Sequence, residues 1–342
     1  MAGTLATGAA IVGPGGRSLA QDRAEAPVTT ASEAELWPTT ELCGSDCPPV
    51  WAERLFNRPI ITPHMDSRMG SNINGPSLIR VPDWVPDRLG CYYLYFSHHR
   101  GSYIRMAYAD HLAGPWTTHE PGVLDITNTG FADHIASPDV VVDEASRSFR
   151  MYFHGVVPGT RTQKTAVALS SDGLTFSQYG GVAMDWYARA FNYRGAVHAL
   201  TMPGVLFRSN TGLGAFERGP SLFPDNTRHS AVRVENQRLQ VFYTNRGDNP
   251  ESVFYREINM AGDWADWSTG PAKLILSPER DYEGANIAPA ASGLGPATSP
   301  LHQLRDPAIF SEQGRDYLIY SVAGEMGLAI AQLHGLRSPT AR

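Results

Sequence analysis

A multi-strand pattern recurs along the chain and constrains its fold more than any other feature. An apolar strand is followed by a turn, an aromatic-rich strand and a third strand that ends in small residues. These units begin near residues 75, 137, 187, 229 and 305, at unequal spacing. Repetition on this scale is typical of a β-propeller, in which each unit forms one blade. The sequence therefore predicts an all-β fold, a five-bladed β-propeller with four antiparallel strands per blade, whose unequal spacing favours long functional loops.

The clearest unit consists of segments 92–97 and 103–109, in which apolar and other residues alternate. Such a period of two predicts half-buried strands, and the short glycine-containing stretch between them predicts a hairpin turn. A turn with only a structural role prefers Asn, Asp and Gly. Because this turn carries His98, His99 and Arg100, its composition indicates a functional site.

Composition narrows the classes of partner. The chain has 342 residues, 18% of them charged and 10% aromatic, with 33 Gly and 25 Pro, which fits a turn-rich all-β protein. A net charge of −6 gives no reason to expect nucleic acid or an anionic membrane as a partner. No run of about 18 apolar residues is present, so we expect no membrane-spanning helix.

The beginning of the chain differs from the repeats. Residues 1–35 are small, polar and poor in aromatics, which is compatible with the end of a secretory signal or with a disordered extension. We expect the propeller to occupy residues 36–342 and the protein to be secreted or periplasmic. Cys43 and Cys47 are close enough to form a disulfide or to remain free thiols, whereas Cys91 lies in a strand pattern and is expected in the core.

The segments that lead into the first strand of each blade are expected to converge, because those strands line the central channel of a propeller. Four of the five carry His, Arg or Asp at comparable positions. The convergent set comprises His64, Asp66, Arg68 and Asn74, then His134 and Asp139, Tyr187 and Arg189, Arg228 and His229, and Arg305 and Asp306, with Glu283 on a nearby loop. Structural interpretations stay open, since an Asp before a Pro also opens turns and single histidines are commonly hydrogen-bonded core residues. His154 and His198 lie within strand patterns and are interpreted as structural.

The five-unit layout, the YYLYF strand after Gly75-Pro76-Ser77, the Gly114-Pro115-Trp116 turn and the RDPAIF segment resemble five-bladed glycosidases. These are the arabinanase, xylosidase and invertase superfamily, and the resemblance covers about residues 60–335. It implies a base or nucleophile Asp in the first blade, an orienting Asp in a later one and an acid Glu on a loop, since glycoside hydrolysis needs two carboxylates. Here the first blade begins with Asn74, so Asp66, Asp306 and Glu283 are the candidates.

Two further resemblances involve histidines. Neoagarobiose hydrolases, which are also five-bladed, use a histidine as the acid, which makes a hydrolase with His and Asp conceivable. The histidines at 98, 99 and 119, together with Tyr187 and Arg189, resemble propeller-type ulvan and rhamnosyl-glucuronate lyases. β-Elimination needs an Arg to neutralise the uronate and a His or Tyr to move the proton.

The leading hypothesis is a glycoside hydrolase that acts on an oligo- or polysaccharide; a polysaccharide lyase and a non-catalytic sugar-binding propeller are the alternatives. Catalytic candidates are Asp306, Glu283, Asp66, His99, His134, His229 and Arg189. Candidates for substrate binding are His64, Arg68, Asn74, His98, Arg100, Asp139, Tyr187, Arg228 and Arg305. We expect no cofactor, while a structural metal ion in the central channel stays open. The sugar, its linkage and the oligomeric state are not predicted.

Overall fold

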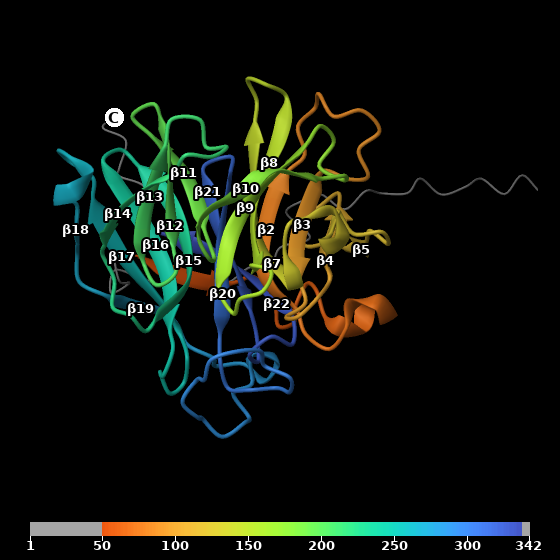
Figure 1. Cartoon of the computed structure of the whole chain (residues 1–342). Coiled ribbons are helices and arrows are strands. Elements are labelled where there is room, and N and C mark those ends of the chain that lie inside the picture. Colours follow the sequence, from red (N-terminus) through yellow and green to blue (C-terminus); the bar gives the residue numbers. More distant parts are fainter. Residues whose placement is uncertain (1–49, 337–342) are drawn as a thin grey trace, which may run out of the picture. The chain divides into compact units, whose positions relative to one another are not determined.

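The computed structural model describes residues 50–336 and confirms an all-β propeller of five antiparallel sheets (Figure 1). The predicted leader, Cys43 and Cys47 lie outside the described residues. The helices among residues 50–336 are short 3-10 turns: η1 (Pro63–Met65), η2 (Ser67–Met69), η3 (Ile126–Asn128), η4 (Trp264–Asp266) and η5 (Asp281–Glu283). None of the helices in this range is long and apolar enough to cross a membrane.

Each blade contains four strands in antiparallel order, and two blades add a short fifth strand. Blade 1 contains β2 (Asn74–Arg80), β3 (Tyr92–Ser97), β4 (Tyr103–Ala109), β5 (Thr117–Thr118) and β6 (Leu124–Asp125). Blade 2 contains β7 (Ala132–Asp143), β8 (Ser148–Val156), β9 (Gln163–Ser170) and β10 (Ser177–Asp185). Blade 3 contains β11 (Arg189–Tyr193), β12 (Ala196–Thr201), β13 (Val205–Ser209) and β14 (Glu217–Ser221). Blade 4 contains β15 (Thr227–Glu235), β16 (Arg238–Asn245), β17 (Val253–Asn259), β18 (Ser268–Thr269) and β19 (Lys273–Leu276).

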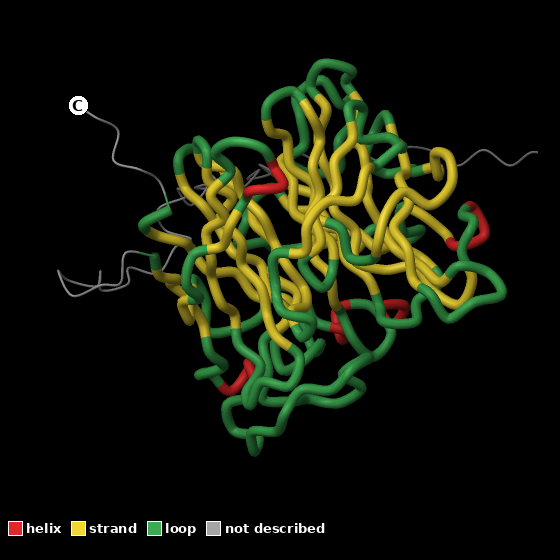
Figure 2. The backbone as a smooth tube through the Cα atoms, turned by 60° about the vertical axis from the view of Figure 1, so that its left-hand side comes forward, coloured by secondary structure: helices red, strands yellow, loops and turns green. Residues whose placement is uncertain are grey.

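Blade 5 closes the ring with a strand from the other end of the described chain. It contains β20 (Arg305–Glu312), β21 (Arg315–Ser321), β22 (Leu328–His334) and, at its outer edge, β1 (Trp51–Arg54). Trp51 pairs with His334 in register and the two rings stack at 4.1 Å. The first strands of the blades contact one another in the cyclic order β2, β7, β11, β15, β20 and back to β2, so they surround the axis of the disc. Figure 2 shows that strands and loops make up the fold and that the helices are short, separate segments.

The core is divided into five layers, one between each pair of neighbouring blades. The pleat of a strand explains this, because successive side chains point to opposite faces. In β3, for example, Leu94 packs toward blade 5 with Ile319, whereas Tyr95 packs toward blade 2 with Met151. Aromatic and β-branched side chains on both faces of a strand are therefore buried, and the strand segments are nearly continuous apolar runs for this reason. Cys91, expected in the core, is a free thiol that lies partly buried just before β3 and packs against the core between blades 1 and 5.

A residue with left-handed backbone recurs at the start of every blade: Gly75 (φ 57°), Ser137 (49°), Tyr187 (55°), His229 (50°) and Asp306 (48°). In β2, β7, β15 and β20 the pairing register shifts at this residue, as expected for a bulge. A bulge re-aims side chains, and here it does so at the axis. In blade 1 the residue must be glycine, because a Cβ on Gly75 would lie 2.6 Å from the Cα of Ser137. No carboxylate fits at this position of the first blade.

Candidate active site

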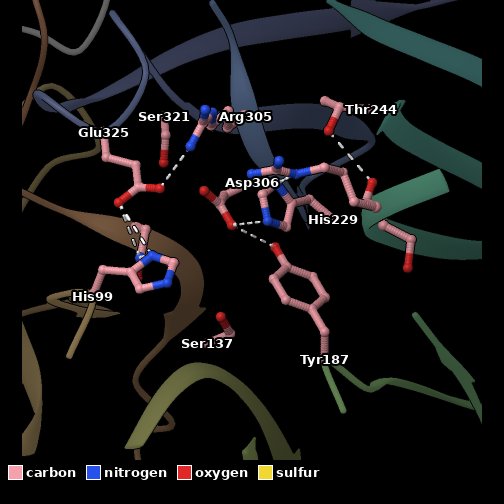
Figure 3. Close-up of polar contacts among 12 residues, drawn as sticks. His99, Ser137, Tyr187, His229, Thr244, Arg305, Asp306, Ser321 and Glu325 are labelled. Carbon is pink, nitrogen blue, oxygen red and sulfur yellow. Dashed lines mark hydrogen bonds and ion pairs between the residues drawn. The ribbon is translucent and has the colours of Figure 1, made fainter. Parts of the chain in front are cut away.

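The candidate site lies at the axis, on the face where the first strands of the blades begin. Antiparallel order also brings the turn between the second and third strand of each blade to this face. Figure 3 shows the result: Asp306 lies between Tyr187 and His229 on one side and Glu325 and His99 on the other. These five residues come from blades 1, 3, 4 and 5 and span more than two hundred positions of the sequence.

Asp306 occupies the centre of the cluster and is only 2% exposed. Its Oδ1 accepts a hydrogen bond from the Tyr187 hydroxyl at 3.0 Å and lies 3.5 Å from His229 Nε2. Its Oδ2 is buried without a hydrogen-bond partner among the described residues, and in Figure 3 it points toward the Glu325 side of the cluster. Burial, together with the negative charge of Glu325, raises the pKa of Asp306 to about 6. Asp306 is therefore suited to hold a proton on Oδ2.

Glu325, in the turn between β21 and β22, is the second carboxylate of the cluster. It accepts a hydrogen bond from Arg305 Nη1 at 2.9 Å, and its Oε2 lies 3.4 Å from both His99 Nδ1 and Asn74 Nδ2. Burial opposes its ionisation, but the bonds to His99 and the charge of Arg305 hold the pKa of Glu325 below its ordinary value. The pKa values of the two neighbouring carboxyl groups are thus shifted in opposite directions, as they are in acid–base pairs.

A third buried carboxylate, Glu251, supports the arginines of the cluster. It lies 3.4 Å from Arg228 and 3.5 Å from Arg305, and it accepts a hydrogen bond from Thr244 at 2.7 Å. The two arginines reach further, since Arg228 donates to the carbonyl of Gly293 at 2.7 Å and Arg305 to that of Gly295 at 3.3 Å. They thereby hold the loop around residues 293–296 against the site.

Arg189 is committed to the scaffold. Its guanidinium donates to the carbonyls of Pro138 (2.7 Å), Ser230 (3.1 Å) and Pro76 (3.3 Å), which belong to three other blades. It also donates to the Tyr187 hydroxyl at 3.2 Å and lies 3.6 Å from Asp139. Arg189 therefore ties four blades together at the axis and fixes the hydroxyl that contacts Asp306.

A row of rings continues from the cluster along the same face. His99 and His134 lie 6.2 Å apart between ring centroids, His134 and His154 6.2 Å, and His154 and Tyr187 6.2 Å. Burial holds the pKa of His154 well below its usual range, and its Nδ1 has no hydrogen-bond partner within residues 50–336. His154, interpreted from its strand pattern as structural, is therefore a buried member of this row of rings. His198 packs between aromatic rings of the blade 3–4 core.

The remaining sequence candidates lie outside the cluster. Asp66 and Arg68 pair with each other at the surface, and His64 is exposed on η1. Glu283 is fully buried, but both oxygens bind Arg54 on the closing strand, at 2.8 and 2.9 Å, and Tyr320 donates to it at 2.9 Å. We therefore assign Glu283 to closure of the disc. His98 packs beside Gly70, whereas Arg100 lies next to His99 at the rim.

Sequence reasoning missed Glu325 and Glu251. Both lie in a turn between the second and third strand of a blade, in the segments AGEMG and NPES. The equivalent turn of blade 1 carries His98 and His99, which were found. Inspecting that turn in every blade would have found the two glutamates. Within residues 50–336, no group of three or more His, Cys, Asp or Glu side chains gathers closely enough to hold a metal ion.

Comparison with known proteins places the chain in a family. No family profile matches it. The uncharacterized protein R118 of Acanthamoeba polyphaga mimivirus is 36% identical over 300 residues, covering 77% of this chain and 83% of that protein. The chain belongs to the family of R118. Because that relative is uncharacterized, it brings no activity with it.

Solved structures of glycoside hydrolases share the predicted propeller fold. An exo-1,5-α-L-arabinanase from a bovine ruminal metagenomic library has a TM-score of 0.52 at 11% identity, covering 76% of this chain and 93% of its own. An endo-1,4-β-xylanase from Bacteroides thetaiotaomicron has a TM-score of 0.53 at 13% identity, covering 80% and 90%. CoXyl43, a family-43 β-xylosidase/α-arabinofuranosidase from a compost metagenome, has a TM-score of 0.53 at 14% identity, covering 82% and 94%. At these identities the likeness establishes the fold.

Proposed function

We propose that this protein is a glycoside hydrolase in which Asp306 is the proton donor. The observation that carries the proposal is the buried Oδ2 of Asp306 at the axis of the disc, which has no hydrogen-bond partner in the described part of the chain and belongs to a carboxyl group whose pKa is raised to about 6. An acid in this state protonates the leaving oxygen of a glycosidic bond near neutral pH. The glycoside hydrolases that share the fold support the same reaction class.

The water-activating group is assigned to His99, with Glu325 behind it. The Glu325 oxygens are engaged by Arg305, Asn74 and His99, so this carboxylate acts on water through the imidazole. His99 Nδ1 lies 3.1 Å from Asn74 Nδ2 and 3.4 Å from Glu325 Oε2. In the proposed tautomer Nδ1 carries a proton directed at Glu325, and Nε2 is the acceptor. The proton of Asp306 goes to the leaving oxygen as the C–O bond breaks, water bonds to the anomeric carbon, and His99 takes the water proton. Glu325 stabilises the resulting imidazolium.

Access to Asp306 involves the loop held by Arg228 and Arg305. Asp306 is nearly inaccessible, so the proposal requires neighbouring groups to shift before a substrate reaches Oδ2, and residues 293–296, which the two arginines hold near the site, are the candidates. The lyase alternative is less well supported. The arginine that this alternative assigned to the uronate, Arg189, has its donors engaged by the scaffold.

The pH dependence of hydrolysis tests the assignment of Asp306 as the acid. Because the acid works only while it is protonated, we expect kcat/KM to fall as the pH rises through about 6. The Tyr187 hydrogen bond stabilises the ionised form of Asp306. Its removal in Tyr187→Phe should raise the pKa of Asp306 further and move the alkaline limb to higher pH.

The alkaline limb is measured from initial rates between pH 4 and 9, with an oligosaccharide that the native enzyme cleaves as the substrate. Tyr179→Phe is the control, since Tyr179 is an exposed tyrosine on β10, and it should leave the limb in place. An alkaline limb in Tyr187→Phe that coincides with that of the native enzyme would exclude Asp306 as the titrating acid.

A further inference from the structure

Two cavities lie next to each other on the face that carries the candidate site. The first, the His99 cavity, measures about 420 Å³ and is lined by His99, Arg100, Asp133, His134, Gln163, Gly295 and Pro296. The second, the Trp186 cavity, measures about 400 Å³ and is lined by Arg161, Thr162, Gln163, Lys164, Asp185, Trp186, Met202 and Pro203. Gln163 lines both, so the two cavities adjoin. Both volumes fall in the usual range for small-molecule sites.

The architecture explains why the cavities follow each other. The His99 cavity lies where the β3–β4 turn of blade 1 meets the start of blade 2, at residues 99–100 and 133–134. The Trp186 cavity lies where the β8–β9 turn of blade 2 meets the segment that leads into blade 3, at residues 161–164 and 185–186. They are successive grooves between blades on one face. A chain molecule bound in the first groove can therefore continue into the second.

The walls of the Trp186 cavity offer an apolar surface for the C–H face of a sugar ring and polar groups for its hydroxyls. Trp186 is half-buried, and its ring packs against His154, 6.1 Å away, which connects it to the row of imidazoles that begins at His99. An indole face offers the large apolar surface that the C–H face of a sugar covers. Lys164 and Asp185 pair at 2.6 Å and, with Thr162 and Gln163, supply donors and acceptors for hydroxyl groups.

We propose that the Trp186 cavity is a second sugar-binding subsite, which takes a residue of the same carbohydrate chain beyond the one at the His99 cavity. This inference rests on the proposed function, because it places the cleaved bond near His99 and Asp306. The substrate is then an oligo- or polysaccharide of which the enzyme binds more than one sugar unit. An enzyme that recognises a single terminal sugar would not need this groove.

Truncation of the indole tests the subsite. In Trp186→Ala the KM for a substrate of three or more sugar residues should rise about tenfold relative to the KM for an aryl monoglycoside, the size expected for losing roughly 1.4 kcal/mol of stacking. Trp186→Phe should recover part of this loss, because a smaller aromatic face remains. Tyr179→Ala, which removes an exposed aromatic outside both cavities, is the matched control and should leave the ratio of KM values unchanged. Thermal unfolding of each variant confirms that it is folded.

Binding to an inactive variant separates this inference from the proposed function. Titration calorimetry of Asp306→Asn, with and without Trp186→Ala, measures the affinity for the same oligosaccharides. Hydrolysis by the native enzyme with equal KM ratios in all variants would overturn the subsite and leave the hydrolase standing. Oligosaccharide binding that weakens on loss of Trp186, without hydrolysis by the native protein, would overturn the hydrolase and keep the subsite. An absence of both binding and hydrolysis across a panel of oligosaccharides would overturn both.

Discussion

Asp306→Asn should lower kcat/KM for an oligosaccharide by about 10²–10⁴-fold, the usual contribution of a positioned general acid. Asparagine keeps the shape of the side chain and can still accept the Tyr187 hydrogen bond on its oxygen. What it loses is the transferable proton. Steady-state rates of the native and variant enzymes on the same oligosaccharide measure the effect, and Asp110→Asn, at an exposed carboxylate after β4, should leave the rate unchanged.

The leaving group distinguishes an acid from a residue that only supports the fold. The dinitrophenolate group of a dinitrophenyl glycoside leaves without being protonated. Asp306→Asn should therefore hydrolyse this substrate at a rate close to that of the native enzyme. His99→Ala should be slow on both substrates, because water activation is needed in either case. An Asp306→Asn protein that is folded and equally slow on the activated glycoside would not fit a proton donor.

Glu283→Ala should destabilise the fold by about 3–5 kcal/mol, because it leaves the guanidinium of Arg54 half-buried without its main partner. Arg54 lies on β1, the strand that completes blade 5, and Glu283 joins it to the loop before β20. Urea unfolding monitored by tryptophan fluorescence measures the loss. Enzyme that remains folded should keep its catalytic rate, since Glu283 lies outside the Asp306 cluster.

Glu279 provides a matched control for this prediction. It also pairs with Arg54, at 3.1 Å, but its side chain is 65% exposed. Surface ion pairs contribute little, so Glu279→Ala should change the free energy of unfolding by less than about 1 kcal/mol. Equal effects of the two substitutions, or a loss of rate in folded Glu283→Ala, would contradict the assignment of Glu283 to ring closure.

The fold could be predicted from the sequence because its signals are local. Alternating apolar residues in segments such as 92–97 reveal a strand without knowledge of its neighbours, and five such units imply a propeller. Convergence could be predicted as well, since topology places the start of every blade at the axis. His134, Tyr187, His229 and Asp306 meet there for this reason, and the β3–β4 turn brings His99 to the same face.

The chemistry within that set could not be predicted, because it depends on which groups each side chain contacts. Arg189 carries the right charge for a substrate, yet three backbone carbonyls from other blades take up its donors. Glu283 lies on a loop, as an acid of the glycosidase superfamily would, yet a strand more than two hundred residues away binds it. Pairing between residues so far apart in the chain produces no local sequence pattern from which it could be predicted. At Gly75, the position of blade 1 that corresponds to Asp306 in blade 5, the nearby Ser137 leaves no room for a side chain.

The central claim is that water cleaves a glycosidic bond at Asp306, and isotope labelling of the products tests it most directly. A panel of neutral and uronic oligosaccharides is incubated with the native protein in H₂¹⁸O, and the products are examined by mass spectrometry. We predict that each cleavage yields a new reducing end containing one ¹⁸O atom, and that Asp306→Asn forms this product far more slowly. A 4,5-unsaturated product without ¹⁸O would instead show β-elimination, and binding without cleavage would show a sugar-binding propeller; either result would contradict the account.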